Sequence, residues 1–187
     1  MKENPLIRLG NVPVQTCTIA ACFDYLAAPN EKVRALEKDG QLIRLKRGLY
    51  VVDERISGKP INVRLCANHI YGPSYVSLQW ALRWYGLIPE RVFTMTSITT
   101  KRTREFENSL GRFTYYQVKP SYFPIGIRSV EENGVNCLMA GPEKARALEK
   151  NGQIIRLKKE LYVASKMETG KELSMLEQHT IAGNIEK

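Results

Sequence analysis

The stretch that decides the fold is residues 31–51, EKVRALEKDGQLIRLKRGLYV. Its first part has apolar residues at helical spacing, and Gly40 can adopt the left-handed backbone that commonly ends a helix. We therefore predict a helix from Glu31 to Asp39, with Asn30 as its N-terminal cap. The residues expected to face inward are Val33, Leu36 and Ala35. The second part alternates apolar and polar residues around Lys46-Arg47-Gly48, which predicts a β-hairpin with a basic tip.

A second helical pattern precedes this stretch. Its apolar residues have the i, i+3, i+4, i+7 spacing of one helical face. The spacing predicts a short helix from Thr18 to Leu26, which Ala27-Ala28-Pro29 ends. Two short helices about a tight turn, followed by a hairpin, are typical of a winged helix-turn-helix. In that fold the second helix enters the major groove, and the hairpin, or wing, reaches the DNA backbone or the minor groove.

The remainder of the chain is predicted to mix helices and strands. The polar segment from Asp53 to Asn62 is interpreted as a linker. Two helices are expected, at Val63 to Ile70 and at Pro73 to Gly86. Four strands are expected, at Arg91 to Thr100, Phe113 to Lys119, Gly126 to Val130 and Val135 to Met139. The predicted fold class is therefore α+β, with an N-terminal winged helix-turn-helix followed by a small α+β domain that has an antiparallel sheet.

The sequence of residues 31–51 is repeated near the end of the given chain. Residues 143–163 read EKARALEKNGQIIRLKKELYV and differ from residues 31–51 at only five aligned positions. No equivalent of the first helix precedes this second copy, and Glu160 replaces Gly48 at the hairpin tip. Since a lone helix and hairpin cannot bury its apolar face, the second copy must pack on something else. It is interpreted as a second DNA contact, an intramolecular decoy or, as we favour, the relic of a duplication.

The charge of the chain suits a polyanionic partner. The formal net charge is +9, and cations that neutralise phosphates release the counterions condensed on DNA. Six cations lie on the predicted second helix and wing, and they are the expected DNA-binding residues: Lys32, Arg34, Lys38, Arg44, Lys46 and Arg47. Arg34 and Lys32 are expected nearest the base edges, with Lys46 and Arg47 on phosphates or in the minor groove. The further basic run from Lys101 to Arg104 is interpreted as a solvated loop.

The sequence argues against several other classes of protein. It contains no G-x-S-x-G, H-E-x-x-H, Walker or G-x-G-x-x-G motif, so we expect neither an enzyme nor a bound cofactor. Its four cysteines include no C-x-x-C pair, and its two histidines lie far from any cysteine pair in sequence, so no metal site is expected. Met1 to Pro13 holds no long apolar run, and charges interrupt every later candidate for a membrane helix. We therefore expect a cytoplasmic protein without a membrane partner.

Three blocks of sequence resemble a known family. They are LIRLKRGLY at residues 42–50, YGPSYVSLQWAL at residues 71–82 and PEKA at residues 142–145. In this order they resemble the AbiEi antitoxins of abortive-infection (type IV) toxin–antitoxin systems, over roughly Thr16 to Ala145. After Ala145 this chain departs from the family, which continues into further helices where this chain repeats its own wing.

The resemblance implies a winged helix-turn-helix joined to an antitoxin domain. Such a protein represses its own operon by binding double-stranded DNA at inverted repeats in its promoter, and dimerisation on DNA would follow from that symmetry. It also counteracts a nucleotidyltransferase-type toxin, which would be its functional partner. The six cations named above would occupy the family's DNA-contacting elements.

The expected domain organisation follows from these observations. Residues 1–56 are assigned to a winged helix-turn-helix DNA-binding domain, residues 57–142 to an α+β antitoxin-like domain, and residues 143–187 to a partial repeat of the recognition helix and wing. The expected function is that of a transcriptional repressor and antitoxin that autoregulates its operon. The alternative is a non-enzymatic protein-interaction module whose winged helix binds a protein partner. A steep loss of DNA affinity with salt would favour the repressor.

Overall fold

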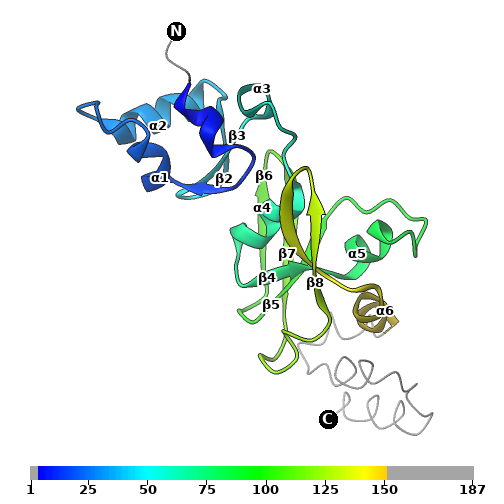
Figure 1. The fold of residues 1–187 in the computed structure, drawn as a ribbon. Helices are drawn as coiled ribbons and strands as arrows, with labels where there is room; N and C mark the ends of the chain where they lie inside the picture. The colour runs from blue at the N-terminus through cyan, green and yellow to red at the C-terminus, as the bar shows by residue number, and fades with distance from the viewer. Residues whose placement is uncertain (1–3, 151–187) are drawn as a thin grey trace, which may run out of the picture.

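The computed structural model describes residues 4–150, and these residues form a mixed α+β fold (Figure 1). The N-terminal unit begins with a 3-10 helix and contains a small sheet with the strand order β1-β3-β2. Its elements are η1 (Pro5–Leu9), β1 (Val14–Gln15), α1 (Thr16–Ala21), α2 (Pro29–Lys38), β2 (Leu42–Lys46), β3 (Leu49–Val52) and α3 (Glu54–Ser57).

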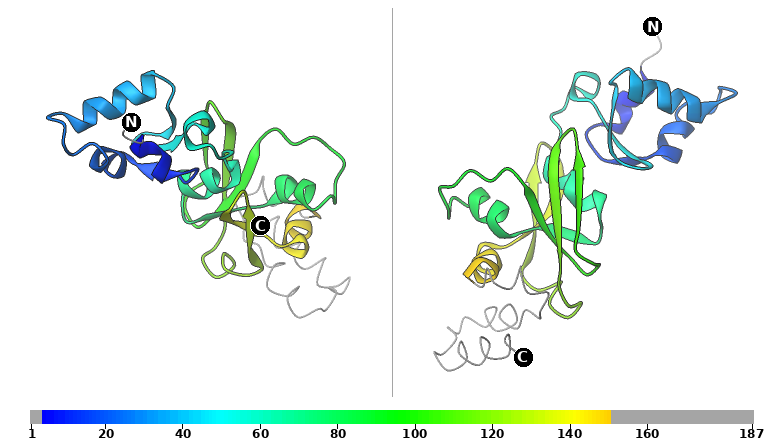
Figure 2. Two further views of the ribbon diagram at one scale, coloured as in Figure 1. Left: turned by 45° about the horizontal axis from the view of Figure 1, so that its top comes forward. Right: turned by 180° about the vertical axis from the view of Figure 1, so that it is seen from behind.

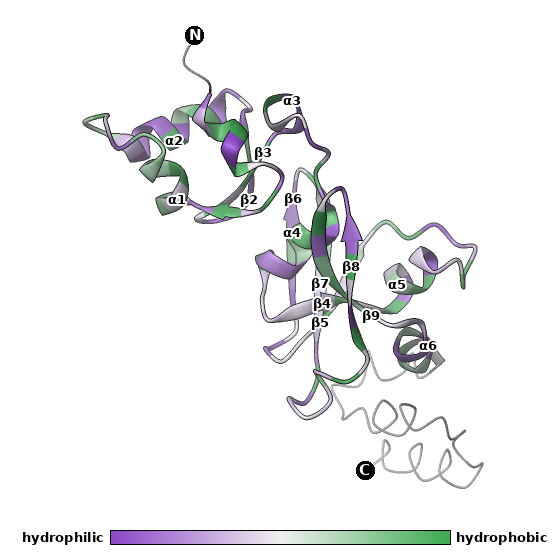
Figure 3. Ribbon diagram, in the orientation of Figure 1, coloured by the Kyte–Doolittle hydropathy of each residue, from purple (hydrophilic) through white to green (hydrophobic). Residues whose placement is uncertain are grey.

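The helix predicted at Glu31 to Asp39 is present as α2, but it begins earlier. Pro29 occupies its first turn, where a proline costs no hydrogen bond and its fixed φ already suits the helix. Asn30 therefore lies inside the helix, and its predicted role as the cap is wrong. Gly40 has the predicted left-handed backbone, with φ of 71°, and its N–H donates to the carbonyl of Glu37. In Figure 3, green and purple alternate along α2, as expected for a helix with one packed face.

The predicted β-hairpin is present as the antiparallel pair β2 and β3, called the wing below, and it is enclosed on both faces. Leu42, Tyr50 and Val52 belong to a core formed with η1, α1 and α2. Leu49 and Val51 belong to the core of the C-terminal unit. All four residues of β3 are therefore buried, which the alternating pattern of a half-exposed hairpin does not predict.

A bulge in β2 turns the end of the wing toward the C-terminal unit. Arg44 pairs with Tyr50, but Lys46 pairs with Leu49, so Leu45 is the extra residue. A bulge of this kind bends the strand and re-aims the side chains beside it. Leu45 accordingly enters the core of the C-terminal unit.

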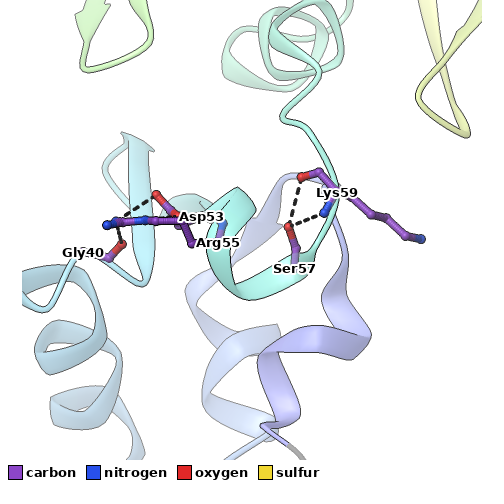
Figure 4. Close-up of polar contacts among 5 residues, drawn as sticks. All are labelled: Gly40, Asp53, Arg55, Ser57 and Lys59. Atoms are coloured by element: carbon purple, nitrogen blue, oxygen red, sulfur yellow. Dashed lines mark hydrogen bonds and ion pairs between the residues drawn. The ribbon is translucent and has the colours of Figure 1, made fainter.

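The segment predicted as a polar linker is ordered, and Figure 4 shows its polar contacts. Asp53 caps α3, because its carboxylate accepts from the backbone N–H and from Nε of Arg55. Nη2 of Arg55 also donates to the carbonyl of Gly40 at 3.4 Å, which joins the end of α2 to this turn. Ser57 is buried, and its hydroxyl bonds with the backbone of Lys59. These contacts give the segment a defined conformation, with a short helical turn in place of a flexible linker.

The C-terminal unit is built on a six-stranded sheet with the order β6-β7-β5-β4-β9-β8. Its elements are α4 (Val63–Ile70), β4 (Ser74–Val76), α5 (Leu78–Trp84), β5 (Met95–Thr99), β6 (Arg104–Asn108), β7 (Gly111–Gln117), β8 (Ile127–Glu132), β9 (Val135–Ala140) and α6 (Pro142–Lys150). The pairs β4–β9 and β5–β7 are parallel, whereas the other pairs are antiparallel. The sheet is therefore mixed, and the prediction of an antiparallel sheet is wrong in this respect.

The helix predicted at Val63 to Ile70 is confirmed as α4, and its N-terminus is capped by the side chain of Asn62. The helix predicted at Pro73 to Gly86 is wrong in its first part, because Ser74–Val76 forms β4 between β5 and β9. The run predicted as a solvated loop contributes its last residue, Arg104, to the edge strand β6. The four predicted strands are present as β5, β7, β8 and β9. Asn133 and Gly134 form the predicted turn between β8 and β9, both with positive φ.

The helix of the second repeat copy is α6, and it packs against α5. Ala145 and Leu148 lie in the core of the C-terminal unit. Figures 1 and 2 show α2 and α6 at opposite ends of the described chain. The rest of the second copy, residues 151–163, lies outside the described residues. Within residues 4–150, none of the helices has the length and apolar character needed to cross a membrane.

Candidate nucleic-acid interface

The exposed face of α2 gathers three polar side chains at a spacing of four residues. Val33 and Leu36 turn inward, which leaves Asn30, Arg34 and Lys38 on one exposed ridge. Ala35 is exposed beside them, so its expected inward position is wrong. Asparagine and arginine are the side chains that most often make paired hydrogen bonds to adenine and guanine, and alanine contacts the methyl group of thymine. The chemistry of this ridge therefore suits base readout.

Sequence reasoning named Arg34 and Lys38 but missed Asn30 and Ala35. Asn30 was assigned to the cap, although its spacing of four from Arg34 and eight from Lys38 was visible in the sequence. Residues four apart on a helix are neighbours on its surface. That spacing is the signal that could have identified the ridge.

Lys32 lies at the side of α2 and is half-buried. Its ammonium is 6.0 Å from the centre of the Phe23 ring, in the turn that follows α1. Lys32 is therefore placed toward the junction of α1 and α2, away from the ridge of Arg34 and Lys38. This position suits contact with a phosphate better than contact with a base edge.

Arg44 is tied to α2 through a shared carboxylate. Its Nη1 lies 3.6 Å from Oε1 of Glu37, and the hydroxyl of Tyr50 donates to Oε2 of Glu37 at 3.1 Å. Burial, followed by the hydrogen bond to Glu37, raises the pKa of Tyr50, whereas the nearby charges of Arg44 and Arg34 lower it. Arg34 of α2 and Arg44 of β2 thus both lie near Tyr50, where Glu37 offsets part of the charge of Arg44.

Lys46 points away from α2 and toward the C-terminal unit. Its ammonium donates to the carbonyl of Ile70, at the C-terminal end of α4. A cation is favoured there because the last carbonyls of a helix carry partial negative charge. Burial lowers the pKa of Lys46, and the positive charges of Lys101 and Arg104 lower it further. The structure therefore places Lys46 between the two units, whereas sequence reasoning placed it on the DNA.

Arg47 and Gly48 form the tip of the wing. Arg47 is exposed, and among residues 4–150 no ion pair involves Arg34, Lys38 or Arg47. Gly48 has φ of 79°, a backbone that side chains with Cβ rarely adopt, and its carbonyl accepts from the N–H of Thr16. The tip is thereby fixed against the start of α1, with the Arg47 side chain in solvent.

The second repeat copy uses its helix differently. Lys144, which aligns with Lys32, is only 6% exposed, and its ammonium donates to the carbonyls of Tyr122, Phe123 and Ile125. It also lies 4.3 Å from the centre of the Tyr75 ring. Ala147 is buried, although its counterpart Ala35 is exposed. In α6, the counterparts of Lys32 and Ala35 therefore hold the helix to the C-terminal unit, whereas Arg146, the counterpart of Arg34, is exposed.

The cysteines, all within the described residues, are free thiols. The pKa of the buried Cys66 thiol is raised to about 12 by burial, so this thiol stays protonated. Cys137 is also buried, whereas Cys17 is exposed. Within the described part of the chain, no group of three His, Cys, Asp or Glu side chains is arranged to hold a metal ion.

A comparison with known protein families finds no family model that matches this chain, and a comparison with curated proteins finds no match.

Proposed function

We propose that residues 4–52 form a winged helix-turn-helix and that the chain is a transcriptional repressor that binds double-stranded DNA. The element order supports this proposal: a first helix, a short strand, two helices and a two-stranded wing, with the first strand paired to the wing. In this arrangement α2 is the helix that enters the major groove.

The observation that carries the proposal is the exposed ridge of Asn30, Arg34 and Lys38 on α2. Arg34 offers paired donors to a base edge and Asn30 offers a donor and an acceptor, while Lys38 and Arg47 offer charge to phosphates. The net charge of +9 supports a polyanionic partner over the alternative of a protein-interaction module.

The experiment is a titration of the full chain with its own upstream duplex and with a scrambled duplex, at two salt concentrations. Arg34→Ala is expected to weaken binding to the specific duplex by about 1–3 kcal/mol and to reduce discrimination between the two. Arg91→Ala is the control. Arg91 is exposed on the loop after α5, and its replacement removes the same charge. If neither duplex binds the wild-type chain at low salt, the protein-interaction module becomes the better description.

The antitoxin half of the proposal is supported by the resemblance of residues 42–50, 71–82 and 142–145 to the AbiEi antitoxins. Under this part of the proposal, the functional partner is a nucleotidyltransferase-type toxin. Co-expression with the toxin encoded beside this chain tests it, and failure of the full chain to restore growth removes the antitoxin role without affecting the DNA-binding role.

A further inference from the structure

The C-terminal unit contributes positive charge directly beside the wing. Nδ2 of Asn108, at the end of β6, donates to the carbonyl of Leu45 at 3.0 Å, which joins the edge of the large sheet to β2. Figure 1 shows β6 reaching the base of the N-terminal unit. The wing and β6 therefore form one surface.

Two cations of the C-terminal unit are held on aromatic rings on this surface. The ammonium of Lys101 lies 5.3 Å from the centre of the Tyr71 ring, and the guanidinium of Arg104 lies 5.0 Å from the centre of the Phe106 ring. The two rings are themselves in contact, with centres 5.5 Å apart. Such contacts hold a cation in place and leave its outer side available to an anion. We call Lys46, Lys101 and Arg104, with these two rings, the basic platform.

The acidic side chains of β6 lie on the other face of the sheet. Successive residues of a strand point to opposite faces, so Glu105 and Glu107 project away from Arg104. Glu107 accordingly pairs with Arg112, and the charge of Glu105 contributes to raising the pKa of Tyr116. Within residues 4–150, no carboxylate forms an ion pair with Lys46, Lys101 or Arg104.

The cations of the platform are close enough to repel one another. After burial, the charges of Lys101 and Arg104 are the causes that lower the pKa of Lys46. Lys46 in turn contributes, after partial burial, to lowering the pKa of the neighbouring His69. An unrelieved cluster of like charges is stabilised when an anion binds to it, and this makes the cluster a candidate anion-binding surface.

We propose that the basic platform binds backbone phosphates of the duplex next to the base pairs that the wing contacts. The proposal rests on the DNA binding proposed above and extends the contact surface onto the C-terminal unit. Lys101 and Arg104 are the phosphate-binding residues, and Lys46, tied to the carbonyl of Ile70, is the residue that positions the wing beside them.

Phosphate contact is favoured over stacking of an unpaired base. The Tyr71 ring is surrounded by Lys101, Phe106 and Tyr115, and the Phe106 ring by Arg104, Tyr71 and Tyr115. A stacking platform needs an open ring face. These rings instead fix the cations at the surface.

The test uses the full chain and measures affinity for the specific and scrambled duplexes over a series of salt concentrations. The double variant Lys101→Gln/Arg104→Gln removes both proposed contacts. The double variant Lys59→Gln/Arg91→Gln removes the same charge from exposed positions elsewhere. Since each phosphate contact contributes about 0.9 to the slope of log affinity against log salt, the slope should become shallower by about 2 in the first variant. Both duplexes should be affected alike, so their affinity ratio should stay unchanged.

The charge-preserving variant Lys101→Arg/Arg104→Lys should keep the wild-type slope, which separates lost charge from lost structure. Equal slopes for the two double Gln variants would overturn the platform. A loss confined to a single-stranded probe would overturn it too, in favour of base stacking. If Arg34→Ala abolishes discrimination while the platform variant behaves like its control, only this inference fails. If the wild-type chain binds neither duplex, the proposed function fails as well.

Discussion

Lys32 and Lys144 occupy the same position in the two repeat copies, and we expect their replacement by alanine to affect different properties. Lys144→Ala should mainly lower stability, because its ammonium is buried and satisfies three backbone carbonyls. Lys32→Ala should mainly weaken DNA binding, because Lys32 lies half-exposed on the helix proposed to enter the groove.

The magnitudes follow from these environments. A buried acceptor that loses its partner costs about 1–3 kcal/mol, and water entering the space left by Lys144 relieves part of that cost. For three carbonyls, together with the contact to the Tyr75 ring, we expect Lys144→Ala to lower the free energy of unfolding by about 3–5 kcal/mol. For a chain of this size such a loss corresponds to a fall in Tm of roughly 10 °C. Lys32→Ala removes a cation held 6.0 Å from a ring, so it should cost less than about 1 kcal/mol.

Urea denaturation of the two variants measures the first expectation, and duplex binding at a temperature where both are folded measures the second. A loss below about 1 kcal/mol for Lys144→Ala would refute the argument from buried hydrogen bonds. A fall in DNA affinity as large for Lys144→Ala as for Lys32→Ala would refute the assignment of α6 to a structural role.

Three further outcomes are expected. Gly48→Ala should destabilise the chain by about 1–2 kcal/mol, because φ at the wing tip is 79° and an L side chain is strained there; an unchanged urea midpoint would contradict this. Glu132→Gln should lower the free energy of unfolding by about 2–4 kcal/mol, because Arg64, which is only 3% exposed, keeps its contact with the Trp84 ring but loses its carboxylate partner; denaturation followed by tryptophan fluorescence measures it. Partial burial and the Lys46 charge lower the pKa of His69 in the folded state, so its contribution to stability is complete above about pH 6.5 and is lost as pH falls toward the lowered pKa. Between pH 7.5 and 5, the free energy of unfolding should therefore depend less steeply on pH for His69→Gln than for the wild type. Identical slopes would argue against a lowered pKa of His69.

The parts of the fold that sequence predicted well depend on local periodicity. The helix at Val63–Ile70 and the wing after Gly40 each carry a clear 3.6-residue or alternating pattern. Strand β4 was missed because Ser74–Val76 is completely enclosed by neighbours that are distant in sequence, so its residues show no alternation. Strand β6 was missed because edge strands carry many charges, and the charges of Arg104–Asn108 suggested a loop.

The candidate site was predictable only as far as it depends on α2. Helical spacing identified Arg34 and Lys38, and the same spacing contained the signal for Asn30. The position of Lys46 could not be predicted, because the bulge at Leu45 and the carbonyl of Ile70 that accepts its hydrogen bond depend on packing between the two units. The parallel pairs of the large sheet join segments far apart in sequence and leave no local trace.

The wing contributes residues to the cores of both units, and this determines how rarely it detaches from the C-terminal unit. Detaching β2 and β3 from the C-terminal unit exposes Leu45, Leu49 and Val51, which are nearly or completely buried. At about 2 kcal/mol for each side chain, that opening costs about 6 kcal/mol. A cost of this size corresponds to on the order of one molecule in ten thousand with the wing detached at any instant. If α2 and the wing bind DNA as proposed, the rest of the chain is therefore held at a fixed angle to the duplex, and two bound copies would have a fixed spacing.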